Sequence, residues 1–193
     1  MRFTSDAGPE CLNMFHLYNI SKIRKFLNQS TTEKIIHAFI TSRLDLNNAL
    51  LFGLPDKLIN KLQRIQNAAA KLVLKASRYD NSFKLLKQLH WLPVRERIHF
   101  KILILTFKSI HNKTASYLTE LITIKTPARS LRYNHGLLLD EPTTPNNNTY
   151  ADRAFSSSSP HLWNKLPEHM RNEHSLELFK SKLKTLLFQK VFH

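Results

Sequence analysis

The sequence has little glycine and cysteine, and both shortages restrict the classes of protein that it can encode. It holds 3 glycines and 1 cysteine among 193 residues. Tight-turned all-β folds and glycine-rich phosphate loops both need more glycine, so the shortage favours helices. The single cysteine, Cys11, cannot form an intrachain disulfide, which suits a reducing compartment. We therefore expect an intracellular protein of the nucleus or cytoplasm.

Long apolar segments are also missing. The longest apolar run, Ile102 to Leu105, is far too short to cross a bilayer. The N-terminus lacks the basic start and following apolar run of a signal peptide. The sequence therefore predicts neither secretion nor a membrane as partner.

Signatures of cofactor, nucleotide and metal sites are absent as well. We find no Walker A loop, no dinucleotide fingerprint and no Gly-x-Ser-x-Gly motif. The ten histidines are scattered: His16 stands alone, and His169 and His174 are five residues apart. Such spacings are typical of surface or core histidines rather than of metal ligands. We predict no metal site, no cofactor and no small-molecule substrate.

Carboxylates that could catalyse phosphoryl transfer are also lacking. In the well-patterned region, Glu33 and Asp56 are best placed to start helices, and neither pairs by spacing with Asp45 or Glu96 to hold two magnesium ions. The string Tyr150–Arg153 resembles the Tyr-x-Asp-Asp turn of polymerases, but an arginine in fourth place cannot bind Mg²⁺. We predict no catalytic residue, and hence no enzyme activity of this chain alone.

Positive charge is what the sequence has in excess. It holds 29 Lys and Arg against 14 Asp and Glu, a formal net charge of +15. From Lys57 to Lys113 there are 13 basic residues and two acidic ones, Asp80 and Glu96, so +11 lies in this stretch. These charges could simply be the solvated faces of amphipathic helices. Their clustering instead favours a surface that binds nucleic acid.

Apolar periodicity predicts a mainly α fold, a helical bundle of about six helices with one irregular, loop-rich segment. Ser30 to Glu33 fit a capping box, and the helix that they open is expected to run to about Phe52 and to stop at Gly53-Leu54-Pro55. Asp56 can cap the next helix. Its apolar stripe consists of Leu58, Leu62, Ile65, Ala69, Leu72 and Val73. A long helix should follow at about Val94–His111. The apolar stripes of the two helices together predict a core that includes Leu62, Ile65, Leu72, Ile98, Ile102 and Leu105.

The second half of the chain has a different composition. Four prolines, three consecutive asparagines and the run Ser156–Ser159 predict loops over residues 125–160. This segment could hold a small β-hairpin that pairs Ser130–Tyr133 with Gly136–Leu139. A last helix should begin at Ser175. The expected regions are a poorly ordered lead-in (1–15), a basic helical region (16–124), a loop-rich segment (125–174) and a C-terminal helix (175–193).

Several blocks, in order, resemble the region after the polymerase domain in non-LTR retrotransposons of the jockey-like and related groups. They are Ser42–Leu51 with Gly53–Pro55, Leu62–Val73, Leu89–Val94 with Arg97-Ile98, Arg153–Ser156 with Leu162–Pro167, and Ser175-Leu176 with Phe179-Lys180. Together the blocks cover nearly everything from about residue 20 to the end. The resemblance implies the C-terminal, thumb-like part of a reverse transcriptase, without the palm that carries the catalytic aspartates.

The resemblance also implies a role in holding nucleic acid. The expected partner is the backbone of RNA or of an RNA/DNA duplex, with a polymerase core on another polypeptide as a further candidate. Phosphate-binding candidates lie on the outer faces of the helices at 57–76 and 94–112: Lys61, Arg64, Lys71, Lys75, Arg78, Arg95, Arg97 and Lys101. Trp91 could stack on a base, although a core position beside Leu92-Pro93 is the commoner role, as it is for Trp163. The alternatives are a protein-binding scaffold and a retrotransposon relic without function.

Overall fold

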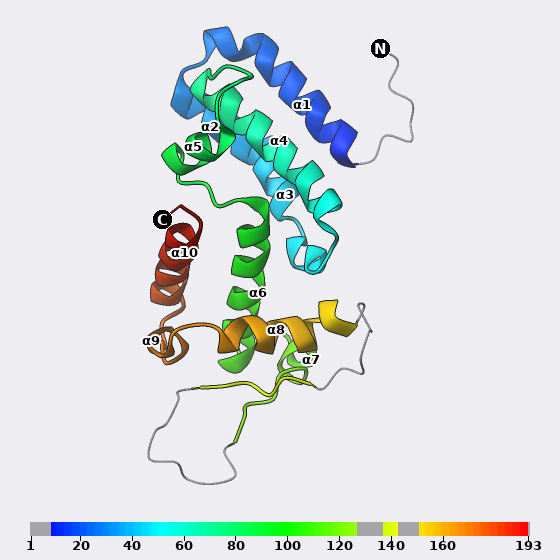
Figure 1. Cartoon of the computed structure of the whole chain (residues 1–193), viewed down its shortest axis with the longest axis vertical. Coiled ribbons are helices and arrows are strands. Elements are labelled where there is room, and N and C mark those ends of the chain that lie inside the picture. Colours follow the sequence, from blue (N-terminus) through cyan, green and yellow to red (C-terminus); the bar gives the residue numbers. More distant parts are fainter. Residues whose placement is uncertain (1–8, 127–136, 143–150, 193) are drawn as a thin grey trace. The chain divides into compact units, whose positions relative to one another are not determined.

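A computed structural model describes residues 9–126, 137–142 and 151–192, and it confirms the mainly α class (Figure 1). The chain divides into two compact units. Unit 1 comprises Met1–Asn48 and Leu54–Arg97, and unit 2 comprises Ala49–Gly53 and Ile98–His193. The division passes through α6 (Val94–Ile110), whose first turn belongs to unit 1. It does not coincide with the predicted region boundaries at residues 124 and 174.

Unit 1 is built from helices that pack around α4. Its elements are α1 (Pro9–Ile23), the 3-10 turn η1 (Arg24–Phe26), α2 (Gln29–Ile36), the π-helical turn η2 (His37–Thr41), α3 (Ser42–Asp45), α4 (Asp56–Leu74) and α5 (Ser82–Gln88). Helices α1, α2 and α5 all contact α4. Figure 1 shows α1 lying along α4 for much of its length. Small residues of α4, Ala69 and Ala70, are fully buried and allow this close approach.

The predicted lead-in is wrong for residues 9–15, which form the first turns of α1. Proline is well suited to a first helical position because it has no amide hydrogen to leave unpaired. The helix is held by its buried face, which includes Asn13, Leu17 and Ile20. Residues 1–8 lie outside the described residues.

The predicted capping box at Ser30 is also wrong. Asn28 is the N-cap of α2: its backbone is extended, and its Oδ1 accepts a hydrogen bond from the Thr31 amide at 2.8 Å. Ser30 is already inside the first turn. Asparagine competes well for this position because its short side chain reaches the free amides of the first turn.

The helix expected to reach Phe52 ends earlier. Helical backbone continues from α2 through η2 and α3, and then stops at Asp45 because Leu46 is extended and Asn47 has a positive φ of 52°. A 3-10 turn, η3 (Asn48–Leu51), follows. Gly53 has a φ of 70°, which agrees with the predicted chain reversal before Pro55.

The α4 helix lies where it was predicted, but its buried face is rotated from the predicted stripe. The buried residues are Ile59, Ile65, Gln66, Ala69, Ala70 and Val73. Leu58 is 41% exposed, and Leu62 and Leu72 are only half-buried. A polar residue takes a core place because Gln66 Nε2 donates to the Leu92 carbonyl at 2.9 Å. Ile98 and Ile102 of α6 are buried as expected, whereas Leu105 is intermediate.

Unit 2 is organised around aromatic side chains. Its elements are the rest of α6, α7 (Ser116–Thr119), the 3-10 turn η4 (Ala151–Arg153), α8 (Phe155–Asn164), α9 (Glu168–Arg171) and α10 (Leu176–Phe192). The Phe179 ring stacks on Phe107 with centroids 4.6 Å apart and lies 5.7 Å from Trp163. All three rings are fully buried. Trp163 Nε1 donates to the Leu137 carbonyl at 3.0 Å, which satisfies the indole inside the core.

The prediction of loops over 125–160 is wrong for the serine run, which forms the first half of α8. Ser158 and Ser159 are buried, and the Ser159 hydroxyl lies 2.6 Å from the Thr106 hydroxyl of α6. Tertiary packing therefore overrides the weak helix propensity of serine. Leu139 pairs in an antiparallel bridge with Ile124, and Ser130–Tyr133, the other arm of the predicted hairpin, lies outside the described residues.

Candidate nucleic-acid interface

One face of α4 carries a line of basic residues, which we call the α4 stripe. It consists of Lys57, Lys61, Arg64, Lys71 and Lys75. At 100° per residue the four positions within the helix fall within an arc of about 80°, opposite the face that includes Ile59, Gln66 and Val73, and Lys75 follows as the C-cap with a positive φ of 53°. The first four span about 21 Å along the axis, at a rise of about 1.5 Å per residue. Because the apolar face packs on α1 and α2, the α4 stripe lies on the outside of unit 1.

The described part of the chain gives three of these side chains no hydrogen bond or ion pair: Lys57, Arg64 and Lys75. All three are exposed, as is Lys61. Lys71 is half-buried and its Nζ donates to the Arg78 carbonyl at 2.6 Å. At these three positions, Lys57, Arg64 and Lys75, the α4 stripe thus carries positive charge that no acidic side chain of the described residues pairs with.

Of the predicted phosphate-binding residues, Lys61, Arg64, Lys71 and Lys75 belong to the α4 stripe, and Arg78 follows it in the turn to α5. Lys101 is exposed on the part of α6 that belongs to unit 2. The sequence reasoning missed Lys57, although its spacing of four residues from Lys61 was a visible signal.

The two predicted arginines at the start of α6 form ion pairs. Arg97 forms a bidentate ion pair with Asp45: Nε donates to Oδ1 at 2.8 Å and Nη2 to Oδ2. The Arg97 side chain is only 17% exposed, and the pair joins two segments 52 residues apart. Arg95 pairs with Asp56, but both side chains are more than half exposed. We therefore count Arg97 among the residues that hold unit 1 together.

A buried arginine closes the C-terminal end of α4. Arg24 donates from Nε to the Leu72 carbonyl at 2.8 Å, from Nη2 to the Val73 carbonyl at 2.7 Å and from Nη1 to the Leu27 carbonyl at 2.7 Å. The last carbonyls of a helix have no partner within it, and they carry the negative end of its dipole. Arg24 therefore satisfies these oxygens and fixes the end of the helix from which Lys75 and Arg78 project.

The two tryptophans are core residues. Trp91 is 5% exposed, its Nε1 donates to Glu33 Oε1 at 3.3 Å, and its ring lies 5.3 Å from that of His37. The suggested stacking of Trp91 on a base is wrong for this conformation, because the ring has no open face. Trp163 is likewise enclosed.

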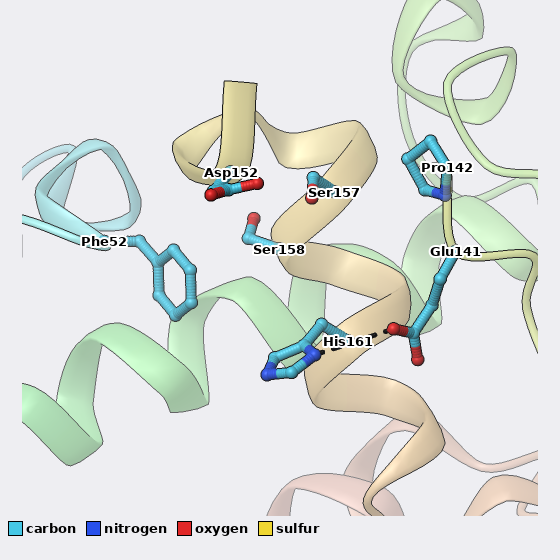
Figure 2. Close-up of a pocket in the computed structure, with 7 residues that line it drawn as sticks. All are labelled: Phe52, Glu141, Pro142, Asp152, Ser157, Ser158 and His161. Carbon is cyan, nitrogen blue, oxygen red and sulfur yellow. Dashed lines mark ion pairs between the residues drawn. The ribbon is translucent and has the colours of Figure 1, made fainter. Parts of the chain in front are cut away.

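Unit 2 contains a pocket of about 360 Å³ with a different chemistry (Figure 2). Its lining consists of Phe52, Glu141, Pro142, Asp152, Ser157, Ser158 and His161. Two carboxylates make it unsuited to phosphates. His161 Nδ1 lies 3.6 Å from Glu141 Oε2, and His161 Nε2 lies 2.6 Å from Lys165 Nζ. Since an ammonium group can only donate, Nε2 is an acceptor there and cannot also serve as a base toward the serines.

Metal sites, membrane-spanning helices and the polymerase-like string are described next, for residues 9–126, 137–142 and 151–192. Among them no group of three or more His, Cys, Asp or Glu side chains could hold a metal ion, and no helix is both long and apolar enough to cross a membrane. In the polymerase-like string, Ala151–Arg153 forms η4 and Asp152 lines the pocket. Tyr150 lies outside the described residues.

Comparison with known proteins adds no relative. The chain matches no protein-family model, and no curated protein or solved structure matches it. The resemblance to reverse transcriptases of non-LTR retrotransposons therefore rests on the sequence blocks alone, and the function that it implies is a hypothesis.

Proposed function

We propose that the chain is a non-catalytic, C-terminal part of a reverse transcriptase from a mobile element, and that it binds RNA or RNA/DNA within the cell. The observation that supports binding is the α4 stripe, in which the exposed side chains of Lys57, Arg64 and Lys75 have no acidic partner among the described residues. The observation that supports the family is the order of the sequence blocks.

The chemistry of the α4 stripe suits a phosphate backbone. Lysine and arginine that neutralise phosphates release condensed counterions, which supplies most of the affinity of sequence-independent binding. Such contacts position a strand without reading its bases. We therefore expect binding that depends strongly on salt and weakly on sequence.

The test is a titration of mixed-sequence RNA by fluorescence anisotropy across a range of KCl concentrations. Lys57, Arg64 and Lys75 are replaced together by Gln; these side chains hold nothing in the described fold. If each meets one phosphate, the slope of log K against log salt should flatten by about two units, at about 0.7 per phosphate.

The control, matched in formal charge, replaces Lys180, Lys182 and Lys184 together by Gln on α10; Lys180 and Lys182 have acidic partners there. It removes the same formal charge from unit 2 and should leave the slope nearly unchanged. An unaltered slope in the α4 variant would contradict the proposal, and a flattened slope in the control alone would move the binding surface to α10.

Absence of polymerase activity is a separate part of the proposal. Its support is the lack in the sequence of a carboxylate set suited to two magnesium ions. Primer extension on an RNA template with Mg²⁺ and all four dNTPs should give no product. Template-dependent product that co-purifies with the chain would overturn this part.

A protein-binding scaffold is the second candidate. Exposed large apolar side chains along α1 and η1 favour it: Met14, Tyr18 and Phe26 are all more than half exposed. Exposed apolar surface of this kind is common at protein interfaces. No binding of RNA at low salt by the unmodified chain would favour the scaffold over nucleic-acid binding. Such a result would also fit a relic without function.

A further inference from the structure

The turn between α4 and α5 is held by its own hydrogen bonds. The Ser77 amide donates to Asp80 Oδ2 at 2.6 Å, and the Asp80 amide donates back to the Ser77 carbonyl at 3.1 Å. Asn81 Oδ1 caps α5 by accepting from the Phe83 amide at 2.9 Å. Lys71 Nζ ties the Arg78 carbonyl to α4. The turn is therefore formed without any ligand.

This turn presents an aromatic ring to solvent. Tyr79 is 86% exposed, more than any other large hydrophobic residue in the described part of the chain. The Arg78 guanidinium lies over its ring, 5.4 Å from the centroid. With so much of the residue exposed, the opposite face of the ring is open.

The surroundings of Tyr79 are basic. Lys71 and Lys75 precede it at the end of α4, Arg78 adjoins it, and Lys84 follows on α5. The adjoining carboxylate of Asp80 accepts a hydrogen bond from the Ser77 amide inside the turn. A ligand on the open face of the ring would thus have cations beside it for its phosphates.

We propose that Tyr79 stacks on an unpaired base of a single-stranded nucleic acid whose backbone lies on the end of the α4 stripe. The phosphate part of this inference rests on the proposed function; the stacking part does not follow from it. Every base offers a π face, so stacking tolerates any sequence, and a neighbouring arginine adds a cation–π contribution. A duplex keeps its bases stacked inside, so Tyr79 should distinguish single strands from duplexes. The shared requirement is an unpaired base on a phosphodiester chain, which RNA and DNA both supply.

The test compares Tyr79→Ala and Tyr79→Phe with the unmodified chain, using short oligouridylate, oligothymidylate and a blunt duplex of equal length as ligands. Tyr79→Ala should bind the single strands about 5- to 100-fold more weakly, with duplex affinity and salt slope unchanged. Tyr79→Phe keeps the ring and should bind like the unmodified chain. Tyr117→Ala, at a tyrosine 64% exposed on α7, is the matched control and should have no effect. Oligodeoxyuridylate, which differs from oligouridylate in the sugar alone, identifies the preferred backbone.

A direct readout completes the experiment. Oligouridylate that carries 5-iodouridine should crosslink to Tyr79 on irradiation, and the adduct should be found in the peptide that contains residue 79. If Tyr79→Ala leaves single-strand affinity unchanged while the salt slope persists, stacking is wrong and the proposed function stands. Equal losses on single strands and duplex also overturn stacking. If the unmodified chain binds none of the ligands, both proposals fail.

Discussion

The basic side chains of α4 in unit 1 and of α10 in unit 2 have different surroundings. On α10, Lys180 Nζ lies 2.7 Å from Glu177 and Lys182 Nζ lies 2.6 Å from Glu173. On α4, Lys57 and Arg64 have no such partner among the described residues. Both helices are basic in sequence, but they differ in how many of their cations already have acidic partners among the described residues. Net charge alone therefore does not locate a binding surface.

Arginines in unit 1 differ in the same way. Arg24 and Arg97 are directed at carbonyl and carboxylate oxygens inside the unit, whereas Arg64 is exposed. This difference separates residues that determine the free energy of unfolding from residues that determine affinity, and substitutions can test it.

The largest effect is expected at Arg24. Replacement by Gln removes a charged donor from three carbonyls that are partly or fully buried, and it should lower the free energy of unfolding by about 3 kcal/mol. Arg64→Gln, at an exposed position, should change it by less than about 0.5 kcal/mol. Urea denaturation followed by circular dichroism measures both. Equal stability of the two variants would show that Arg24 does not cap α4.

The two ion pairs at the start of α6 provide the next comparison. Arg97→Ala leaves Asp45 without its bidentate partner and should cost about 2 kcal/mol, a value reduced because the carboxylate is 40% exposed. Arg95→Ala breaks a pair that is mostly solvated and should cost less than about 1 kcal/mol. Thermal denaturation of both variants checks the order. A larger loss for Arg95→Ala would contradict it.

In unit 2, Arg153 packs on a glycine. A Cβ at Gly53 would lie 2.6 Å from Arg153 Cγ, and Gly53 has a φ of 70°. Gly53→Ala should therefore destabilise the protein by about 1–2 kcal/mol from its backbone conformation alone. The double variant Gly53→Ala with Arg153→Ala should recover the part due to the clash. If Gly53→Ala has the same urea midpoint of unfolding as the unmodified chain, the turn at Gly53 does not have this conformation.

The sequence was sufficient to predict the helical class and the position of α4. A long helical repeat of apolar residues locates a helix even when its buried face is assigned one or two residues away from the true one. The sequence was insufficient for the rotation of the α4 core face: the buried Gln66 donates to the Leu92 carbonyl, a contact between distant segments, and accepts from Gln63. The serine run was assigned to loops because helix propensity is local, whereas burial of Ser158 and Ser159 against α6 is not.

For the candidate site, the spacing of basic residues predicted most of the α4 stripe. It could not show that Arg97 is engaged by Asp45, 52 residues away. Nor could it choose among aromatic residues. Trp91 was named as a residue that could stack on a base, with a core position as its commoner role; its place in the core and the exposure of Tyr79 are set by the fold.

The smallest predicted effect concerns pH, and each unit supplies one histidine to it. Burial, with Arg43 nearby, lowers the pKa of His16 in unit 1, and burial, with Lys113 nearby, lowers the pKa of His111 in unit 2. His16 Nε2 is buried without a hydrogen-bond partner among the described residues, and the His111 ring lies 4.3 Å from that of Phe107. A lowered pKa means that the folded protein binds these protons less readily than the unfolded chain.

Stability should therefore be fully present above about pH 6.5, the usual histidine pKa, and should decline as the pH falls through that value toward the lowered one. The double variant His16→Phe with His111→Phe keeps two rings but cannot be protonated, so its stability should vary less between about pH 7.5 and about pH 5.5. Urea midpoints at the two pH values measure the change.

Glu173 does not interfere with this measurement. Lys182 lowers the pKa of its carboxyl, so the stability that Glu173 contributes is lost only at still more acid pH. If the unmodified chain and the double variant lose the same stability over this range, other groups carry the acid sensitivity. Single variants then tell whether His16 in unit 1 or His111 in unit 2 contributes more.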